Sequence, residues 1–164
     1  MSDLQYRKKL VSNLLDYKMR PLDKYFLMIP DDKLNFKPTE DSMSVADLGI
    51  HIYQCMLVNA SVIEKGDFTK EELTEQGLDQ KKISSTKDIV EYGEKIKAYM
   101  RKILEKITEE DLETEVTYSC WGGFKANVGF ALEVIIEETV HHRGQLCVYL
   151  RMLGLKPSSI YDYS

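Results

Sequence analysis

Apolar residues recur at three- and four-residue intervals in four long stretches of the sequence. In the second stretch, Leu48, His51, Cys55, Val58 and Val62 follow one another at alternating spacings of three and four. This periodicity is typical of an α-helix that packs one side against its neighbours. It predicts helices over residues 4–28, 44–64, 86–107 and 127–153.

Proline, glycine and small polar residues mark the limits of these helices. Pro21 falls inside the first segment and should kink it or divide it into two pieces. Ser85 or Thr86 can cap the third helix at its N-terminus. Gly154 is well placed to end the fourth helix, and Pro157 prevents its resumption.

One stretch departs from the helical pattern. EVTYSCWGGF, residues 115–124, places β-forming residues ahead of a Trp-Gly-Gly turn. Because strand signals are otherwise few, the sequence predicts an all-α fold, a four-helix bundle, in which residues 1–164 form a single domain.

Composition narrows the class of protein. The chain has 164 residues, of which 43% are hydrophobic and 30% are charged, as in ordinary globular proteins. A net charge of −5, with lysine and arginine dispersed along the chain, argues against a nucleic-acid partner. The longest apolar stretches are interrupted by polar residues and the N-terminus does not resemble a signal peptide, so we expect no membrane partner. Three cysteines without a CxxC pair favour a reducing, cytoplasmic location.

Polar residues interrupt the apolar seam of the fourth predicted helix, within the string EETVHHRGQLC at 137–147. Glu138 and His142 are four positions apart, so they lie only about 40° apart around a helix axis. Side chains at that spacing can converge on one point. His141 lies to the other side, and Gln145 could orient a ligand by hydrogen bonding.

The second predicted helix carries a histidine of its own, His51, in its apolar seam. Helical bundles commonly bind metals through inward Glu and His residues of different helices, and a divalent cation offsets the cost of burying them. Two imidazoles and one carboxylate suit Zn²⁺, Fe²⁺ or Ni²⁺. The alternative is a structural cluster in which His51, Glu138 and His142 are hydrogen-bonded to one another without metal.

Three other residues have simpler interpretations. Arg143 is expected to be a solvated or ion-paired helix residue. Gly144 lowers helix stability by up to about 1 kcal/mol, which suggests that it permits close approach of a neighbouring helix. Trp121 is expected to pack in the core.

The string HHRGQLCVYLRMLGLKP at 141–157 resembles the end of the last helix in the DinB-like (DinB/YfiT) superfamily. SVADLGIHIYQ at 44–54 is similar to the segment of that family's second helix that carries a histidine, and IPDDKLNFKPTEDSMS is similar to its first connection. The resemblance covers most of the chain. It implies a four-helix bundle with up-down-down-up topology.

The resemblance also implies a divalent metal ion held by three histidines, one on the second helix and two that are four positions apart on the last. His51 and His142 match two of these positions, and the third falls on Glu138. We therefore expect a His₂Glu variant of the site, with metal ligands His51, Glu138 and His142. His141 and Cys55 are the remaining candidates, ranked lower because neither lies at a matching position.

For function, the resemblance implies a metal-dependent hydrolase, or a transferase that uses a low-molecular-weight thiol, acting on a small-molecule substrate. It also implies a homodimer. The alternative is a non-catalytic bundle, with or without metal, that has a role in association or in a stress response.

Overall fold

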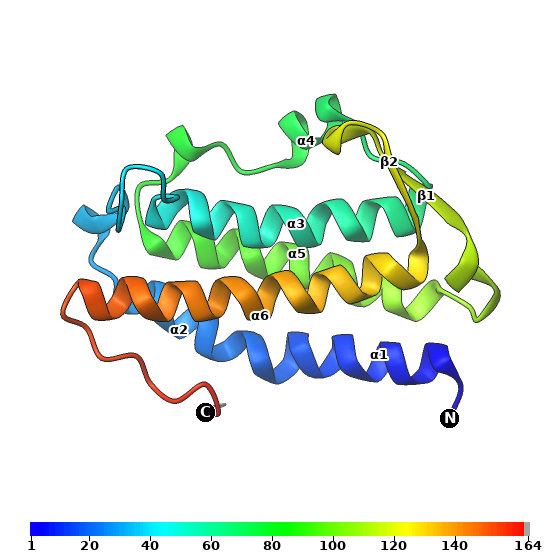
Figure 1. The fold of residues 1–164 in the computed structure, drawn as a ribbon, viewed down its shortest axis with the longest axis horizontal. Coiled ribbons are helices and arrows are strands. Elements are labelled where there is room, and N and C mark those ends of the chain that lie inside the picture. Colours follow the sequence, from blue (N-terminus) through cyan, green and yellow to red (C-terminus); the bar gives the residue numbers. More distant parts are fainter. Residues whose placement is uncertain (163–164) are drawn as a thin grey trace.

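Four long helical segments lie side by side in the computed structural model, which describes residues 1–162 (Figure 1). The first consists of α1 and α2, joined end to end by a π-helical turn (η1), and α3, α5 and α6 follow. The first and last segments run in one direction, and α3 and α5 run in the other. The predicted all-α, up-down-down-up bundle is therefore confirmed. The bounds are α1 Asp3–Asn13, η1 Leu14–Lys18, α2 Met19–Met28, α3 Val45–Lys65, α5 Thr86–Lys106 and α6 Val128–Met152.

Shorter elements occupy the connections. Because α3 and α5 run in the same direction, the chain between them must return along the length of the bundle, and it does so over the outer side of α3 (Figure 1). The Gln54 amide of α3 holds this return segment by donating to the Leu78 carbonyl. The short elements are η2 Asp31–Lys33, α4 Lys70–Gln76, η3 Gln80–Lys82, η4 Glu110–Glu113, β1 Glu115–Tyr118, η5 Ser119–Trp121 and β2 Phe124–Asn127.

The same capping device begins the two parallel helices. Ser44 accepts a hydrogen bond from the Asp47 backbone N–H, and the Asp47 carboxylate accepts one from the Ser44 N–H in return. Ser85 and Asp88 repeat this arrangement at the start of α5. Each pair satisfies two backbone donors that the first helical turn leaves free. Of the two cap residues proposed for the third helix, Ser85 is therefore the one used.

The irregularity in the first segment lies upstream of Pro21. The π-helical turn covers Leu14–Lys18, whereas Pro21 is the third residue of α2. A proline ring clashes with the carbonyl four residues earlier, here that of Tyr17, and a widened turn relieves that crowding. Arg143 of α6 donates from Nη1 to the Lys18 carbonyl in this turn, at 3.0 Å. Arg143 is also buried, contrary to the solvated position expected from the sequence.

A buried polar cluster lies between α2, α3 and α5. The Lys97 ammonium is 2.6 Å from Asp23 Oδ2, and the Tyr53 hydroxyl donates to the other oxygen of the same carboxylate. Lys97 is only 3% exposed, and Tyr53 is fully buried. Each charged group here has a charged or hydrogen-bonded partner, as burial requires.

The least helical stretch of the sequence forms a two-stranded antiparallel hairpin, β1–β2, in which Val116 pairs with Ala126. Gly122 and Gly123 have φ angles of +84° and +80° in the connecting turn, a conformation that favours glycine. Trp121 precedes this turn, stacks on the Tyr118 ring and is 45% exposed. The expectation that Trp121 packs in the core is therefore wrong, because the turn places it at the surface.

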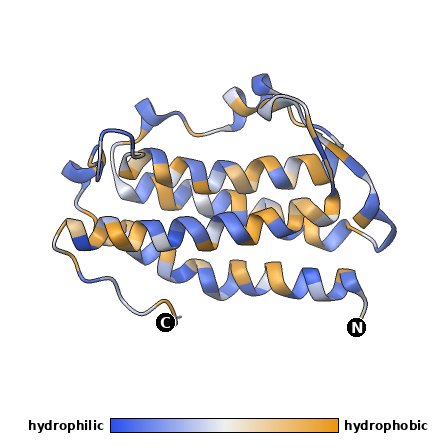
Figure 2. Cartoon of the chain, in the orientation of Figure 1, coloured by the Kyte–Doolittle hydropathy of each residue, from blue (hydrophilic) through white to orange (hydrophobic). Residues whose placement is uncertain are grey.

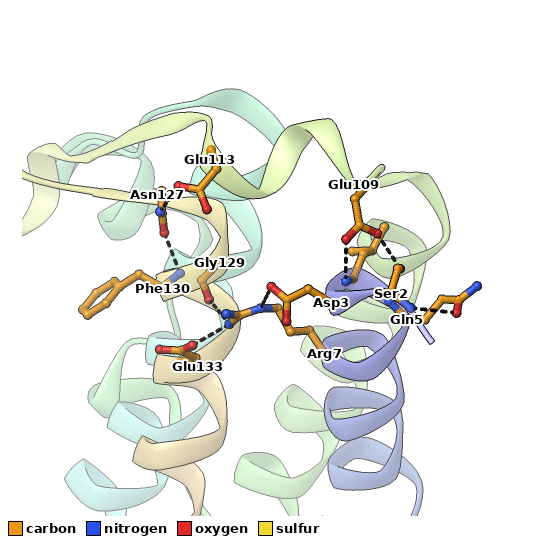
Figure 3. Close-up of polar contacts among 11 residues, drawn as sticks. Ser2, Asp3, Gln5, Arg7, Glu109, Glu113, Asn127, Gly129, Phe130 and Glu133 are labelled. Atoms are coloured by element: carbon orange, nitrogen blue, oxygen red, sulfur yellow. Dashed lines mark hydrogen bonds and ion pairs between the residues drawn. The ribbon is translucent and has the colours of Figure 1, made fainter.

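The start of α6 is tied to the N-terminus of α1 (Figure 3). The Arg7 guanidinium donates to the Gly129 carbonyl at 3.2 Å and forms ion pairs with Glu133 and with Asp3. The Asn127 side chain caps α6 by accepting from the Phe130 N–H at 2.8 Å. These contacts fix the position of the helix that carries two of the three candidate metal ligands. Within residues 1–162, none of the helices is long and apolar enough to cross a membrane.

Candidate metal centre

His51 of α3 faces Glu138 and His142 of α6 across the middle of the bundle. Oε2 of Glu138 lies 3.4 Å from Nε2 of His51 and 3.1 Å from Nε2 of His142. One ligand atom from each of the three residues lies within 4.8 Å of the others. The structure thus brings together the three residues that the sequence and the resemblance single out.

The site lies at the boundary between the core and the surface. His142 is 6% exposed, whereas the side chains of His51 and Glu138 are 38% and 36% exposed. The centres of the two imidazole rings are 4.6 Å apart and the rings are nearly perpendicular, so that the edge of one meets the face of the other. This position agrees with the hydropathy of α6, which is polar in its middle and apolar at both ends (Figure 2). A solute can therefore approach the cluster from the side of His51 and Glu138.

Burial lowers the pKa of His51, and the neighbouring His142 lowers it further, while the hydrogen bond that the Glu138 carboxylate accepts opposes both effects. A lowered pKa favours the neutral imidazole at neutral pH. A neutral imidazole has one nitrogen lone pair that can bind a metal ion.

The distances suit a metal ion. Ligand atoms about 2.1 Å from a tetrahedral Zn²⁺ lie roughly 3.4 Å from one another. The two separations from Oε2 of Glu138, 3.1 and 3.4 Å, are close to this value, and all three ligand atoms lie within 4.8 Å of one another. Two imidazoles and one carboxylate are also the protein ligands of several catalytic zinc sites, in which the fourth position is left for water or substrate.

A series of hydrogen bonds orients His142 through Nδ1, the ring nitrogen that does not face Glu138. Nδ1 of His142 lies 2.8 Å from Oε1 of Gln145, the orienting residue expected from the sequence. The Gln145 amide nitrogen lies 3.3 Å from the Tyr149 hydroxyl, which donates to the Met43 carbonyl at 2.9 Å. Tyr149 is buried, with its ring edge-on to Phe36. Sequence patterns did not identify Tyr149 or Met43, because Met43 lies in the loop before α3 and only the fold brings it to α6.

The two lower-ranked candidates lie outside this cluster of ligand atoms. His141 is exposed, and its ring lies against that of His142, with the ring centres 4.7 Å apart. Cys55 is buried next to Asn59, whose amide nitrogen is 3.6 Å from the sulfur. Burial, reinforced by the charge of Glu138, raises the pKa of the Cys55 thiol to about 12. This thiol is therefore protonated at neutral pH, whereas a metal ligand must be a thiolate.

Gly144 does not have the role within the chain that the sequence suggested. A Cβ atom added at this position would meet no described atom within 4 Å, so no neighbouring helix of the same chain approaches it.

Comparison with known proteins places this chain in a family. The sequence profile of the DinB family matches residues 15–164. Protein YjoA of Bacillus subtilis, described as uncharacterised, is 35% identical over 130 residues, which cover 77% of each chain.

Solved structures agree with this assignment. The crystal structure of the DinB-like YjoA covers 93% of this chain and 96% of its own, with a TM-score of 0.71 and 26% identity. A DinB-like protein of Bacillus cereus has a similar fold, with a TM-score of 0.68 and 22% identity, and covers 88% of this chain and 91% of its own. The profile match over most of the chain and the sequence identity with YjoA lead to one conclusion: the chain belongs to the DinB family.

Proposed function

We propose that this protein binds a divalent metal ion, Zn²⁺, Ni²⁺ or Fe²⁺, through Nε2 of His51, a carboxylate oxygen of Glu138 and Nε2 of His142. The observation that carries the proposal is the position of Glu138, whose Oε2 faces both imidazole nitrogens at 3.1 and 3.4 Å. A carboxylate replaces one imidazole of the three-histidine set that the family resemblance implies. It remains a good ligand for these cations.

The proposed activity is metal-dependent hydrolysis, or transfer of a low-molecular-weight thiol, with a small molecule as substrate. A divalent metal at such a site polarises a carbonyl group and lowers the pKa of a bound water or thiol. The partly exposed side chains of His51 and Glu138 leave one side of the site open to a substrate. All three cysteines of the chain are buried, so a thiol nucleophile would have to come from solution. Three buried, unpaired cysteines also favour the proposed cytoplasmic location.

Metal content is the measurement that tests the proposal. Protein purified without a tag should contain about one equivalent of metal per chain by mass spectrometry. The His51→Ala/His142→Ala variant should contain none, and Glu138→Ala should lose most of it. His141→Ala is the matched control, because it removes a neighbouring imidazole that lies outside the cluster.

If neither the native protein nor native protein incubated with Zn²⁺, Ni²⁺ and Fe²⁺ retains metal, the proposal is wrong. The alternative would then hold, a non-catalytic bundle in which the three side chains bond to one another. If metal is retained, hydrolysis of esters and amides and transfer of small thiols to electrophiles are the activities to screen.

We also propose that the protein is a homodimer, paired through the outer face of α6. Val140, Val148 and Met152 are 41%, 52% and 54% exposed on this helix. An antiparallel pairing about a two-fold axis at Gly144 sets residues at equal distances from Gly144 against each other. Val140 then meets Val148 of the second copy, and Glu137 meets its Arg151. Because a two-fold axis creates each contact twice, a single self-complementary face is sufficient.

Charge exchange tests this pairing. Glu137→Arg and Arg151→Glu each place like charges opposite one another, and each variant should be monomeric by analytical ultracentrifugation. An equimolar mixture of the two variants should form a heterodimer, because each Arg then meets a Glu. A native protein that is monomeric, or two variants that remain dimeric, would contradict the proposed interface.

A further inference from the structure

We propose that Tyr149 is a positioning residue that fixes the tautomer of His142 through Gln145, so that Nε2 of His142 presents its lone pair to the metal site. This inference rests on the proposed function for its purpose, although the tautomer itself can be measured without any metal. Three hydrogen bonds carry it, each with a direction that can be assigned from chemistry.

The direction is set at the far end of the chain of hydrogen bonds. The Met43 carbonyl can only accept, so the Tyr149 hydroxyl uses its one hydrogen to bond it, at 2.9 Å. The Tyr149 oxygen can then only accept from Gln145. The Gln145 NH₂ group therefore faces Tyr149, and its carbonyl oxygen faces His142.

The carbonyl of Gln145 determines the state of the imidazole. Because a carbonyl oxygen only accepts, the hydrogen of a neutral His142 must be on Nδ1, 2.8 Å away. Nε2 then has no hydrogen. This nitrogen is the one that lies 3.1 Å from Oε2 of Glu138. Two lone pairs facing each other at that distance repel, unless a cation lies between them.

Tyr149 disfavours the opposite orientation of the Gln145 amide. If the Gln145 amide were turned over, its NH₂ group would donate to Nδ1 of His142. The Nε2–H of His142 could then donate to Glu138, which would close the site without metal. The turned amide would present its oxygen to Tyr149 and take the hydroxyl hydrogen away from Met43. The Met43 carbonyl would then lose the donor that the buried Tyr149 hydroxyl supplies.

Nitrogen NMR of the metal-free protein tests the assignment. The chain contains three histidines, so ¹⁵N-histidine labelling with His51→Gln and His141→Gln spectra assigns each ring. At a mildly alkaline pH, where imidazoles are neutral, native His142 should carry its hydrogen on Nδ1. Tyr149→Phe keeps the ring against Phe36 but frees the amide to turn over, and His142 should shift toward the Nε2–H tautomer. Zn²⁺ affinity of this variant should fall by about tenfold to a hundredfold.

A second substitution separates positioning from general damage. Tyr149→Phe/Gln145→Glu replaces the amide with a carboxylate, which has no NH₂ group and can only accept from Nδ1. This double variant should restore hydrogen on Nδ1. Tyr99→Phe is the matched control, because it removes a hydroxyl that bonds Glu64, away from the metal site, and should leave the tautomer unchanged.

Two outcomes have distinct meanings. Native metal-free protein with hydrogen on Nε2 of His142, or a Tyr149→Phe variant with an unchanged tautomer, would overturn the role of Tyr149. Hydrogen on Nδ1 in a protein that binds none of the tested metals would leave that role intact and contradict the proposed function alone.

Discussion

The ring of Tyr53 occupies the space beside Gly93. A Cβ atom at Gly93 would lie 2.3 Å from Cζ of Tyr53, much closer than two carbon atoms can approach. The ring cannot retreat easily, because it is fully buried and its hydroxyl bonds Asp23. Gly93 is thus required for the contact between α3 and α5, although glycine is a weak helix former.

We expect Gly93→Ala to lower the free energy of unfolding by about 1–3 kcal/mol, the usual cost of overpacking a core. Urea denaturation measures this change. Gly144→Ala is the matched control: it has open space around the added methyl group and should raise stability by up to about 1 kcal/mol. Both variants should be compared at a dilution at which the chain is monomeric. Equal effects of the two substitutions would contradict the packing described here.

The buried ion pair of Lys97 and Asp23 leads to a second prediction. Lys97→Met keeps the length of the side chain but leaves the Asp23 carboxylate buried without its cation. Removing one partner of a buried pair costs about 3–5 kcal/mol. Lys87→Met breaks only an exposed ion pair with Glu91 and should cost less than about 1 kcal/mol in the same denaturation measurement. If the two substitutions lowered the free energy of unfolding equally, the buried ion pair would contribute no more to stability than the exposed one.

The start of α5 should confer a pH-dependent part of the stability. The backbone N–H of Ser84, then its hydroxyl and the N–H of Ser85, lower the pKa of Asp88. A carboxyl whose pKa is lowered on folding stabilises the protein above its unfolded pKa, about 3.9, and loses this effect as the pH falls through the folded value. The difference in unfolding free energy between native protein and Asp88→Asn should therefore shrink below about pH 4. A difference that stays constant down to acid pH would exclude the charge as its cause.

The thiols should be unreactive in the folded protein. Burial raises the pKa of Cys55 to about 12 and also raises that of Cys120. Alkylation by iodoacetamide near neutral pH should therefore be slow for both until denaturant is added, as mass spectrometry of the peptides can follow. Cys55→Ser should leave metal content unchanged. Loss of metal in that variant would place the thiolate among the ligands and contradict the His₂Glu assignment.

Local patterns predicted those features that depend on neighbours in sequence. The three- and four-residue spacing located every long helix, and the same spacing brought Glu138 and His142 to one side of α6. The meeting of His51 with Glu138 was expected from the family resemblance, but other contacts between distant segments were not predictable. The pairing of Lys97 with Asp23, and of Tyr149 with Met43, leaves no periodic signal in either segment.

The two helical glycines illustrate this limit. The sequence pattern favours Gly144 as the point of close approach within the bundle. In the structure, Gly93 has that role, because Tyr53 lies against it. A glycine inside a helix indicates that another segment packs closely against it, but only the fold identifies that segment. Likewise, Pro21 predicts a distortion of the first helix. The distortion lies about one turn upstream of Pro21, because the proline ring would clash with the carbonyl four residues earlier.

His51 and Glu138 are separated by 87 positions in the sequence. Their nitrogen and oxygen atoms therefore come together only after the last helix has packed against α3, and an unfolded chain offers no comparable set of ligands. A cation that binds only the assembled site shifts the folding equilibrium, by about 2.7 kcal/mol when its free concentration is a hundred times the Kd. Under the proposed function, the amount of folded protein in a cell would depend on metal supply, and chelation would shorten its lifetime before any activity was measured.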